Sequence, residues 1–182
     1  TLLYDVNEYT DDKFLNIFDM AFPLIDIKLQ IKDFYQDLKV DIIYIHQLSS
    51  LNHLKDIVDL DIKTVKFIHD HKLLCLREHK YKTISNDTCK EPIGINCYSC
   101  LGFLNRSDSI FKVKFSSLNN LKNIQNINRD IDAFIVASKY MKNHLIEHNF
   151  NMDSIYINNL YVKESDTTFI DLPIENRLLF VG

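Results

Sequence analysis

The sequence predicts an α/β protein with a doubly wound parallel sheet, and two observations carry this prediction. Short runs rich in Ile, Val, Tyr and Phe are continuously apolar, as in parallel strands that are covered on both faces. Segments with apolar residues at helical spacing lie between these runs. The chain has 182 residues, of which 46% are hydrophobic, which is enough for one ordinary domain or for half of a two-domain enzyme.

Apolar runs mark the expected strands. Residues 1–4 (TLLY) read as the end of one strand, and five longer runs are expected to be buried. These are residues 41–46 (DIIYIH), 64–69 (TVKFIH), 131–138 (IDAFIVAS), 155–159 (IYINN) and 177–182 (RLLFVG).

Four segments have apolar residues at the spacing of one helix face. Ser138 stands just before the last of them, where a hydroxyl can cap a helix N-terminus. The segments are residues 31–38, residues 51–58, the stretch that holds Phe111, Phe115 and Leu118, and residues 139–149.

Polar side chains follow four of the expected strands. Ligands of open parallel sheets bind outside the carboxyl ends of the strands, so these side chains are candidates for one binding edge. His69 can exchange hydrogen bonds with a sugar or phosphate, and Asp70 can orient its ring. A solvated strand end, with Asp70 capping the next segment, is the alternative. The other candidates at this edge are His46, Gln47, Ser138, Lys139, Asn158 and Asn159.

The cysteines form a second candidate site, with the spacing C-x13-C-x7-C-x2-C. The CYSC pair has the knuckle spacing of zinc sites, and four thiolates complete a closed tetrahedral site. The loop at about residues 75–105 has little regular pattern, so a structural zinc ion would order it. Free thiols, disulfides and an iron–sulfur cluster stay open, with His71 and His79 as substitute ligands. The proposed ligands are Cys75, Cys89, Cys97 and Cys100.

Composition excludes several classes of function. A net charge of −4 gives no electrostatic footprint for nucleic acid. Motifs of NTPases, dehydrogenases and serine hydrolases do not occur. No apolar run approaches a membrane span of about 18 residues, so the sequence predicts a cytoplasmic protein. Basic residues before position 131 read as a solvated helix face, with contact to an anionic acceptor or the inner membrane surface as the alternative; they are Lys112, Lys114, Lys122 and Arg129.

The order of these pieces resembles the N-terminal, acceptor-side domain of a family-four retaining glycosyltransferase of the GT-B type. The resemblance covers about residues 40–182 and implies a Rossmann-like domain with a Cys-rich loop insertion, facing a donor-binding domain across a cleft. It rests on DIIYIHQLSSL, TVKFIHDHKLLC, IDAFIVASKYMKNHLIEHNF, SIYINNLYV and RLLFVG.

The resemblance also implies an activity and a division of the chain. His69 matches the cleft histidine that contacts the donor sugar, Asp70 is its neighbour, and Ser138 and Asn159 line the same edge. The implied reaction transfers a hexose from a nucleotide sugar to a glycan or lipid-linked acceptor in surface polysaccharide synthesis, with retention of configuration and no metal in the catalytic step. Residues 1–162 would form the acceptor-side domain, 163–176 the linker and 177–182 the first strand of a missing donor-binding domain.

The chain departs from the family in three ways. It contains neither a Gly-rich loop after the first strand nor the two-glutamate donor motif, and Leu160 stands where the family often has Gly. We therefore expect this fragment to be inactive alone. Two alternatives stay open. One is a non-catalytic, zinc-stabilised interaction module on the same scaffold, and the other is a different GT-B enzyme such as a sugar-phosphate synthase, which should lack the cysteine loop.

Overall fold

The computed structural model describes most of the predicted elements. Several predicted features lie outside its described residues: the helix at 31–38, Gln47, Phe111, Lys112, Leu160, the linker at 163–176 and the strand at 177–182. The described residues are 2–4, 12–19, 21–23, 40–46, 48, 50–82, 85–106 and 113–159.

The fold is built on a four-stranded parallel sheet with the order β10-β9-β4-β3. Among the strands of this sheet, each lies beside the one that precedes it in the sequence. Each connection therefore moves one strand further across the sheet in the same direction. This arrangement confirms an α/β protein with a parallel sheet. The strands coincide with four predicted runs and are β3 (Ile42–Ile45), β4 (Lys63–Ile68), β9 (Ala133–Val136) and β10 (Ile155–Ile157).

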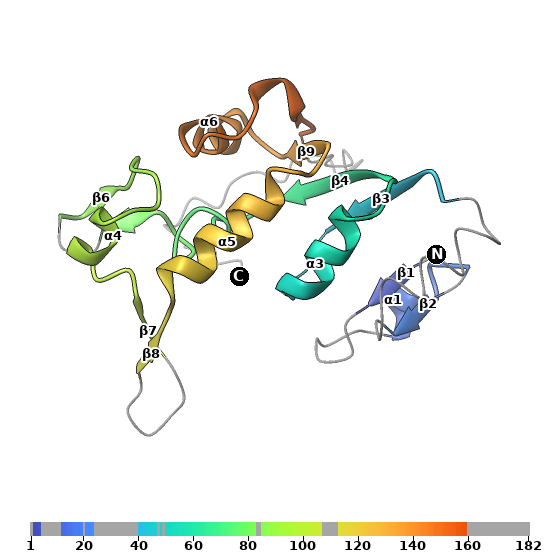
Figure 1. Cartoon of the computed structure of the whole chain (residues 1–182), viewed down its shortest axis with the longest axis horizontal. Helices are drawn as coiled ribbons and strands as arrows, with labels where there is room; N and C mark the ends of the chain where they lie inside the picture. Colours follow the sequence, from blue (N-terminus) through green and yellow to red (C-terminus); the bar gives the residue numbers. More distant parts are fainter. Residues whose placement is uncertain are drawn as a thin grey trace, which may run out of the picture.

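Three helices accompany these strands. Figure 1 shows α3 and α5 side by side, with α6 set apart from them beyond β9. A serine precedes each helix, and its hydroxyl accepts a backbone N–H three residues later, which confirms the cap predicted at Ser138. The helices are α3 (Leu51–Val58), α5 (Leu118–Asn128) and α6 (Lys139–Glu147).

The helix predicted around Phe111 and Phe115 is wrong at Phe115. This residue ends strand β8 (Val113–Phe115), which pairs in antiparallel fashion with β7 (Leu104–Arg106). The pairing uses backbone groups that a helix would need, and α5 begins only after the cap at Ser117. Phe115 is exposed and stacks on Phe103, with ring centroids 6.3 Å apart.

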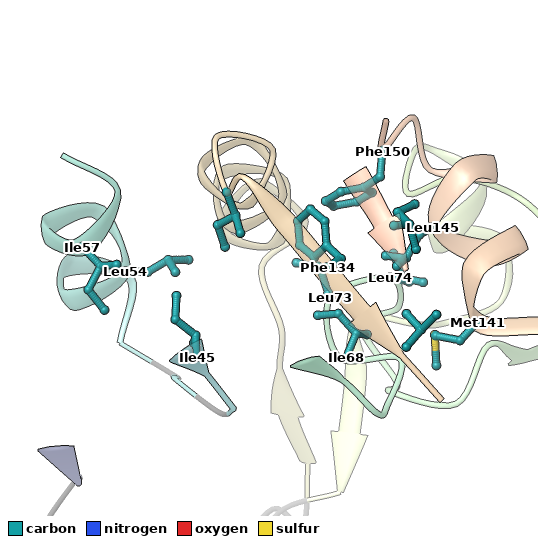
Figure 2. Close-up of a cluster of buried hydrophobic side chains, with 13 residues drawn as sticks. Ile45, Leu54, Ile57, Ile68, Leu73, Leu74, Phe134, Met141, Leu145 and Phe150 are labelled. Carbon is teal, nitrogen blue, oxygen red and sulfur yellow. The ribbon is translucent and has the colours of Figure 1, made fainter. Parts of the chain in front are cut away.

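The helices and sheet share one apolar core. Alternate strand residues, among them Ile45, Phe134 and Val136, belong to this core. Figure 2 shows Ile45 near Leu54 of α3, and Phe134 on the side of Leu145 of α6. The opposite face was predicted to be covered, but the described elements leave it open. On that face Ile42, Tyr44 and Tyr156 are 59%, 55% and 59% exposed.

Hydrogen bonds fix the amino ends of β4 and β9. The Asp132 carboxylate accepts from the backbone N–H of Thr64 at 2.8 Å and from the Lys63 ammonium at 2.8 Å. These bonds lower the pKa of Asp132 to about 2, with the Lys63 side chain as the largest cause. The two strands therefore start in register, which also aligns their carboxyl ends.

Shorter elements lie at the two ends of the molecule in Figure 1, with β1 and β2 at one end and β6 and α4 at the other. None of the helices in the described ranges combines the length and the apolar character that a membrane crossing requires. The remaining elements are β1 (Leu2–Tyr4), paired in parallel with β2 (Ala21–Pro23), α1 (Asp12–Leu15), the hairpin of β5 (Tyr81–Lys82) and β6 (Asp87–Thr88), α4 (Asn96–Ser99) and η1 (Met152–Ser154).

Candidate functional site

The parallel register places the predicted polar residues at one edge of the sheet. His46 follows β3, His69 follows β4 and Ser138 comes two residues after β9. The backbone N–H of Asn158 donates to the carbonyl of Val136 at 2.9 Å, which keeps the end of β10 at the same level. The carboxyl ends of all four strands thus meet at one edge.

An aromatic stack occupies the β3–β4 part of this edge. The rings of His46 and His69 lie 5.3 Å apart between centroids and are inclined by 14°. Phe67 stacks on His46 at 5.7 Å and on His69 at 6.1 Å. All three side chains lie on the face of the sheet opposite the helices. Each histidine ring is therefore held by stacking while it stays accessible, with His69 41% exposed.

Asp70 lies close to both groups that the sequence interpretation named, the His69 ring and the segment after β4. One carboxylate oxygen accepts the backbone N–H of Lys72 at 2.9 Å, which caps the turn after β4. The other lies 3.5 Å from Nε2 of His69 and 3.7 Å from the Lys72 ammonium. Asp70 therefore fixes the turn and places a negative charge beside the His69 ring, where it can orient the ring for hydrogen bonding.

The remaining edge residues are less tightly grouped. The Ser138 hydroxyl accepts the N–H of Met141 at 3.2 Å, so its lone pair is engaged while its proton can still be donated. Lys139 is the exposed first residue of α6, and Asn159 is exposed two residues beyond β10. These side chains share the edge by register, whereas contacts between side chains join His46, Phe67, His69, Asp70 and Lys72.

The four cysteines line a single small cavity of about 40 Å³. They reach it from separate segments: after β4, after β6, from α4 and from the residue that follows α4. All four are free thiols. Burial raises the pKa of the Cys97 thiol, and the neighbouring sulfurs of Cys100, Cys75 and Cys89 raise it further.

The CYSC segment forms a tight turn that is closed by hydrogen bonds to the Cys97 carbonyl. The carbonyl of Cys97 accepts the N–H of Gly102 at 3.0 Å and the thiol of Cys100 at 3.4 Å. Leu101 adopts a φ of 54°, the left-handed region. A Cβ atom at Gly102 would lie 3.2 Å from the Cys100 sulfur, so glycine permits this close approach.

The donor set fits a zinc ion chemically, because four thiolates make a closed structural site. Within the described ranges, no three potential ligands already stand together at metal-binding spacing. The substitute ligands do not line the cavity. His79 is exposed, and the His71 ring lies 5.3 Å from His144 and 6.2 Å from Tyr140, measured between centroids.

Sequence reasoning missed a buried polar group beside this cavity. Lys80 is 1% exposed, and its ammonium donates to the Glu91 carbonyl at 2.8 Å and to Nε2 of His148 at 3.1 Å. The other ring nitrogen of His148 lies 2.7 Å from the His144 carbonyl, so it donates there and leaves Nε2 as the acceptor. The i, i+4 spacing of His144 and His148 could have indicated that these histidines act together. The local sequence around Lys80 does not indicate that this lysine is buried.

Arg129, one of the residues of the predicted basic segment, is engaged in the fold. Its guanidinium donates to the Asn126 side chain at 2.6 Å and to the His148 carbonyl at 3.3 Å, and it lies 5.8 Å above the Phe150 ring. Lys122 is exposed, and Lys112 lies outside the described residues. Arg129 therefore serves packing at the end of α6.

Comparison with protein-family models, with curated proteins and with solved structures finds no match. The established result is the parallel α/β fold with its histidine edge and cysteine cavity. The glycosyltransferase resemblance rests on sequence motifs alone.

Proposed function

We propose that this chain is the acceptor-side part of a retaining GT-B glycosyltransferase of family four. It would act in the cytoplasm, peripheral to the inner face of the membrane, in the synthesis of a surface polysaccharide. The observation that supports this most is the exposed stack of His46 and His69, with Asp70 beside it, at the carboxyl edge of a parallel sheet. Ligands of such sheets bind at that edge.

The proposed roles follow from the chemistry of each side chain. His69 contacts the hexose of the nucleotide-sugar donor through a ring nitrogen, and Asp70 orients the ring and balances charge that develops near it. His46 braces His69 by stacking and offers its own ring nitrogens to the acceptor. Gln47, Ser138, Lys139 and Asn159 would supply further hydrogen bonds to a glycan or lipid-linked acceptor.

The proposal requires a second domain. Residues 1–162 would hold the acceptor, with the cysteine segment as an insertion, and residues 163–176 would lead to a donor-binding domain that starts at 177–182. The nucleotide sugar would bind between the two domains, because an exposed histidine on one sheet edge cannot enclose a substrate alone. Transfer is therefore expected only from the longer natural polypeptide.

The test is turnover of a panel of nucleotide sugars by the natural polypeptide extended past both ends of this chain. His69→Ala should lower kcat/KM by on the order of 10²-fold or more if the ring acts in the transition state. The matched control is Lys55→Ala, which changes an exposed lysine in the middle of α3. Equal activity of the His69→Ala and wild-type enzymes would refute the site, and absence of turnover and donor binding would refute the enzyme.

One observation favours a second candidate, a zinc-stabilised interaction module without catalysis. Four thiols from three short stretches of residues 75–100 line one cavity, as expected where a structural zinc ion organises a loop. A module would bind zinc and fold but bind no nucleotide sugar. Zinc is therefore proposed as a structural cofactor under both functions, and the donor assay separates them.

A further inference from the structure

We propose that Lys80 is the buried counter-charge of a zinc site formed by Cys75, Cys89, Cys97 and Cys100. This inference rests on the zinc site proposed above and adds a residue that is not itself a ligand. In this proposal the Lys80 ammonium offsets the negative charge of four thiolates. Its burial then stabilises the folded protein only when the metal is bound.

Charge balance creates the need for such a residue. Four thiolates around a divalent cation carry a net charge of −2, and burying uncompensated charge is unfavourable. A buried cation beside the cavity would lower the cost of ionising the thiols.

Lys80 is placed to supply that cation. It lines the same cavity as the four cysteines and is 1% exposed. An ammonium carries three donor hydrogens. Two of these point to the Glu91 carbonyl and to Nε2 of His148, which leaves one for a thiolate. Both of the assigned partners are uncharged acceptors, because His148 receives the bond on an unprotonated nitrogen.

The described carboxylates do not neutralise Lys80. The ion pairs given by the described residues join Lys63 to Asp132, His69 and Lys72 to Asp70, and His144 to Glu147. Burial lowers the pKa of Lys80, and the charges of Cys89 and Cys75 oppose this more strongly than that of Glu147. Lys80 is therefore left available as a counter-charge for the thiolates that would form when a metal binds.

The backbone also ties Lys80 to the cysteine segment. Its φ is 54°, an uncommon left-handed value for a lysine, and its carbonyl accepts the N–H of Cys89 at 2.7 Å. The chain therefore adopts an unfavourable conformation at the position that both delivers the ammonium to the cavity and anchors one proposed ligand.

The experiment measures zinc affinity by competition with a chromogenic chelator under reducing conditions, together with the visible spectrum of the cobalt-substituted protein. Lys80→Gln keeps hydrogen-bond donors but removes the charge, and it should weaken zinc binding by about 10–100-fold. Lys80→Arg keeps the charge and should retain most of the affinity. The matched control is Lys66→Gln, which removes the other buried lysine, away from the cavity, and should leave the affinity unchanged.

A second measurement compares urea unfolding of wild type and Lys80→Gln with zinc and after its removal. The proposal predicts that Lys80→Gln destabilises the zinc-bound protein but is neutral or stabilising without zinc, because the buried ammonium then loses its counter-charge. A purely structural lysine would destabilise equally in both states, and that result would overturn the proposal.

The outcomes also separate the two levels of inference. A wild-type protein that binds no zinc overturns the zinc site itself. Stoichiometric zinc binding with the same affinity in wild type and Lys80→Gln overturns only the role of Lys80. A Lys80→Gln chain that fails to fold both with and without zinc assigns Lys80 to packing and also overturns that role.

Discussion

The parallel sheet and the cysteine segment at residues 75–106 are two neighbouring regions with opposite ways of holding together. The sheet region buries a continuous set of large apolar side chains, including Phe134 and Leu145 at 1% and 0% exposure. In the cysteine segment, Leu76 is the one buried hydrophobic side chain among the described residues, and the largest buried side chain is that of Lys80.

The two regions differ in the source of their stability. Burial of apolar surface supports β4, β9 and α6 without any ligand. The cysteine segment has two-residue strands and one turn of helix, so it buries too little to offset the entropy of ordering its chain. A metal that joined the four thiols would supply the order that apolar burial does not, and this is the physical basis of the zinc proposal.

The largest expected effect comes from a deletion in the sheet core. Leu145→Ala removes a fully buried side chain of α6 and should lower the free energy of unfolding by about 2–5 kcal/mol. Urea unfolding followed by circular dichroism measures the loss, and zinc should not restore it. Met152→Ala, at a 57% exposed position, is the control and should change the stability by less than about 0.5 kcal/mol. Equal effects of the two substitutions would contradict the assignment of the core.

The next effect is a pH dependence built into the sheet. The Lys66 ammonium is buried against the Asn128 side chain at 2.7 Å, and burial lowers its pKa to about 8 from 10.5. Between these two values the unfolded chain binds more protons than the folded one, so stability rises as pH rises through this window. The full rise is roughly 3 kcal/mol, at about 1.4 kcal/mol for each unit of pKa.

The control for this rise is Lys66→Met, which removes the titrating group. Urea unfolding of both proteins at several pH values from 7 to about 10, with reductant present, gives a difference in which the other titrating groups cancel. We expect wild type to gain stability relative to the variant as pH increases. A difference that stays flat, or that falls with pH, would show that Lys66 is not buried as a charged group.

The same contrast explains what the sequence could predict. Strands β4 and β9 were predictable because continuous apolar runs specify buried strands, and the cap at Ser138 was predictable because capping is local. The edge position of His46 and His69 followed from a topological rule that holds for any parallel sheet.

The errors and omissions lie where tertiary context decides. Phe115 has helical spacing with Phe111 and Leu118, yet its backbone pairs with β7, a partner that local periodicity cannot reveal. The burial of Lys66 and Lys80 was missed for the same reason, because composition assigns lysine to the surface. The stacking of Phe67 on both histidines also depends on strand register, which the sequence alone left open.

The smallest expected effect on the sheet comes from removing zinc. This experiment tests most directly whether the sheet and the cysteine segment are stabilised independently. A chelator should leave global unfolding of β4, β9 and α6 within about 1 kcal/mol, because their core contains none of the cysteines. In the same sample, amides that are hydrogen-bonded within the segment, such as Cys89 N–H to the Lys80 carbonyl and Gly102 N–H to the Cys97 carbonyl, should lose protection against hydrogen exchange. Re-added zinc should restore that protection, and a Cys97→Ser variant should not recover it. Loss of protection throughout the sheet on chelation would instead show that the two regions unfold as one unit, with the metal supporting both.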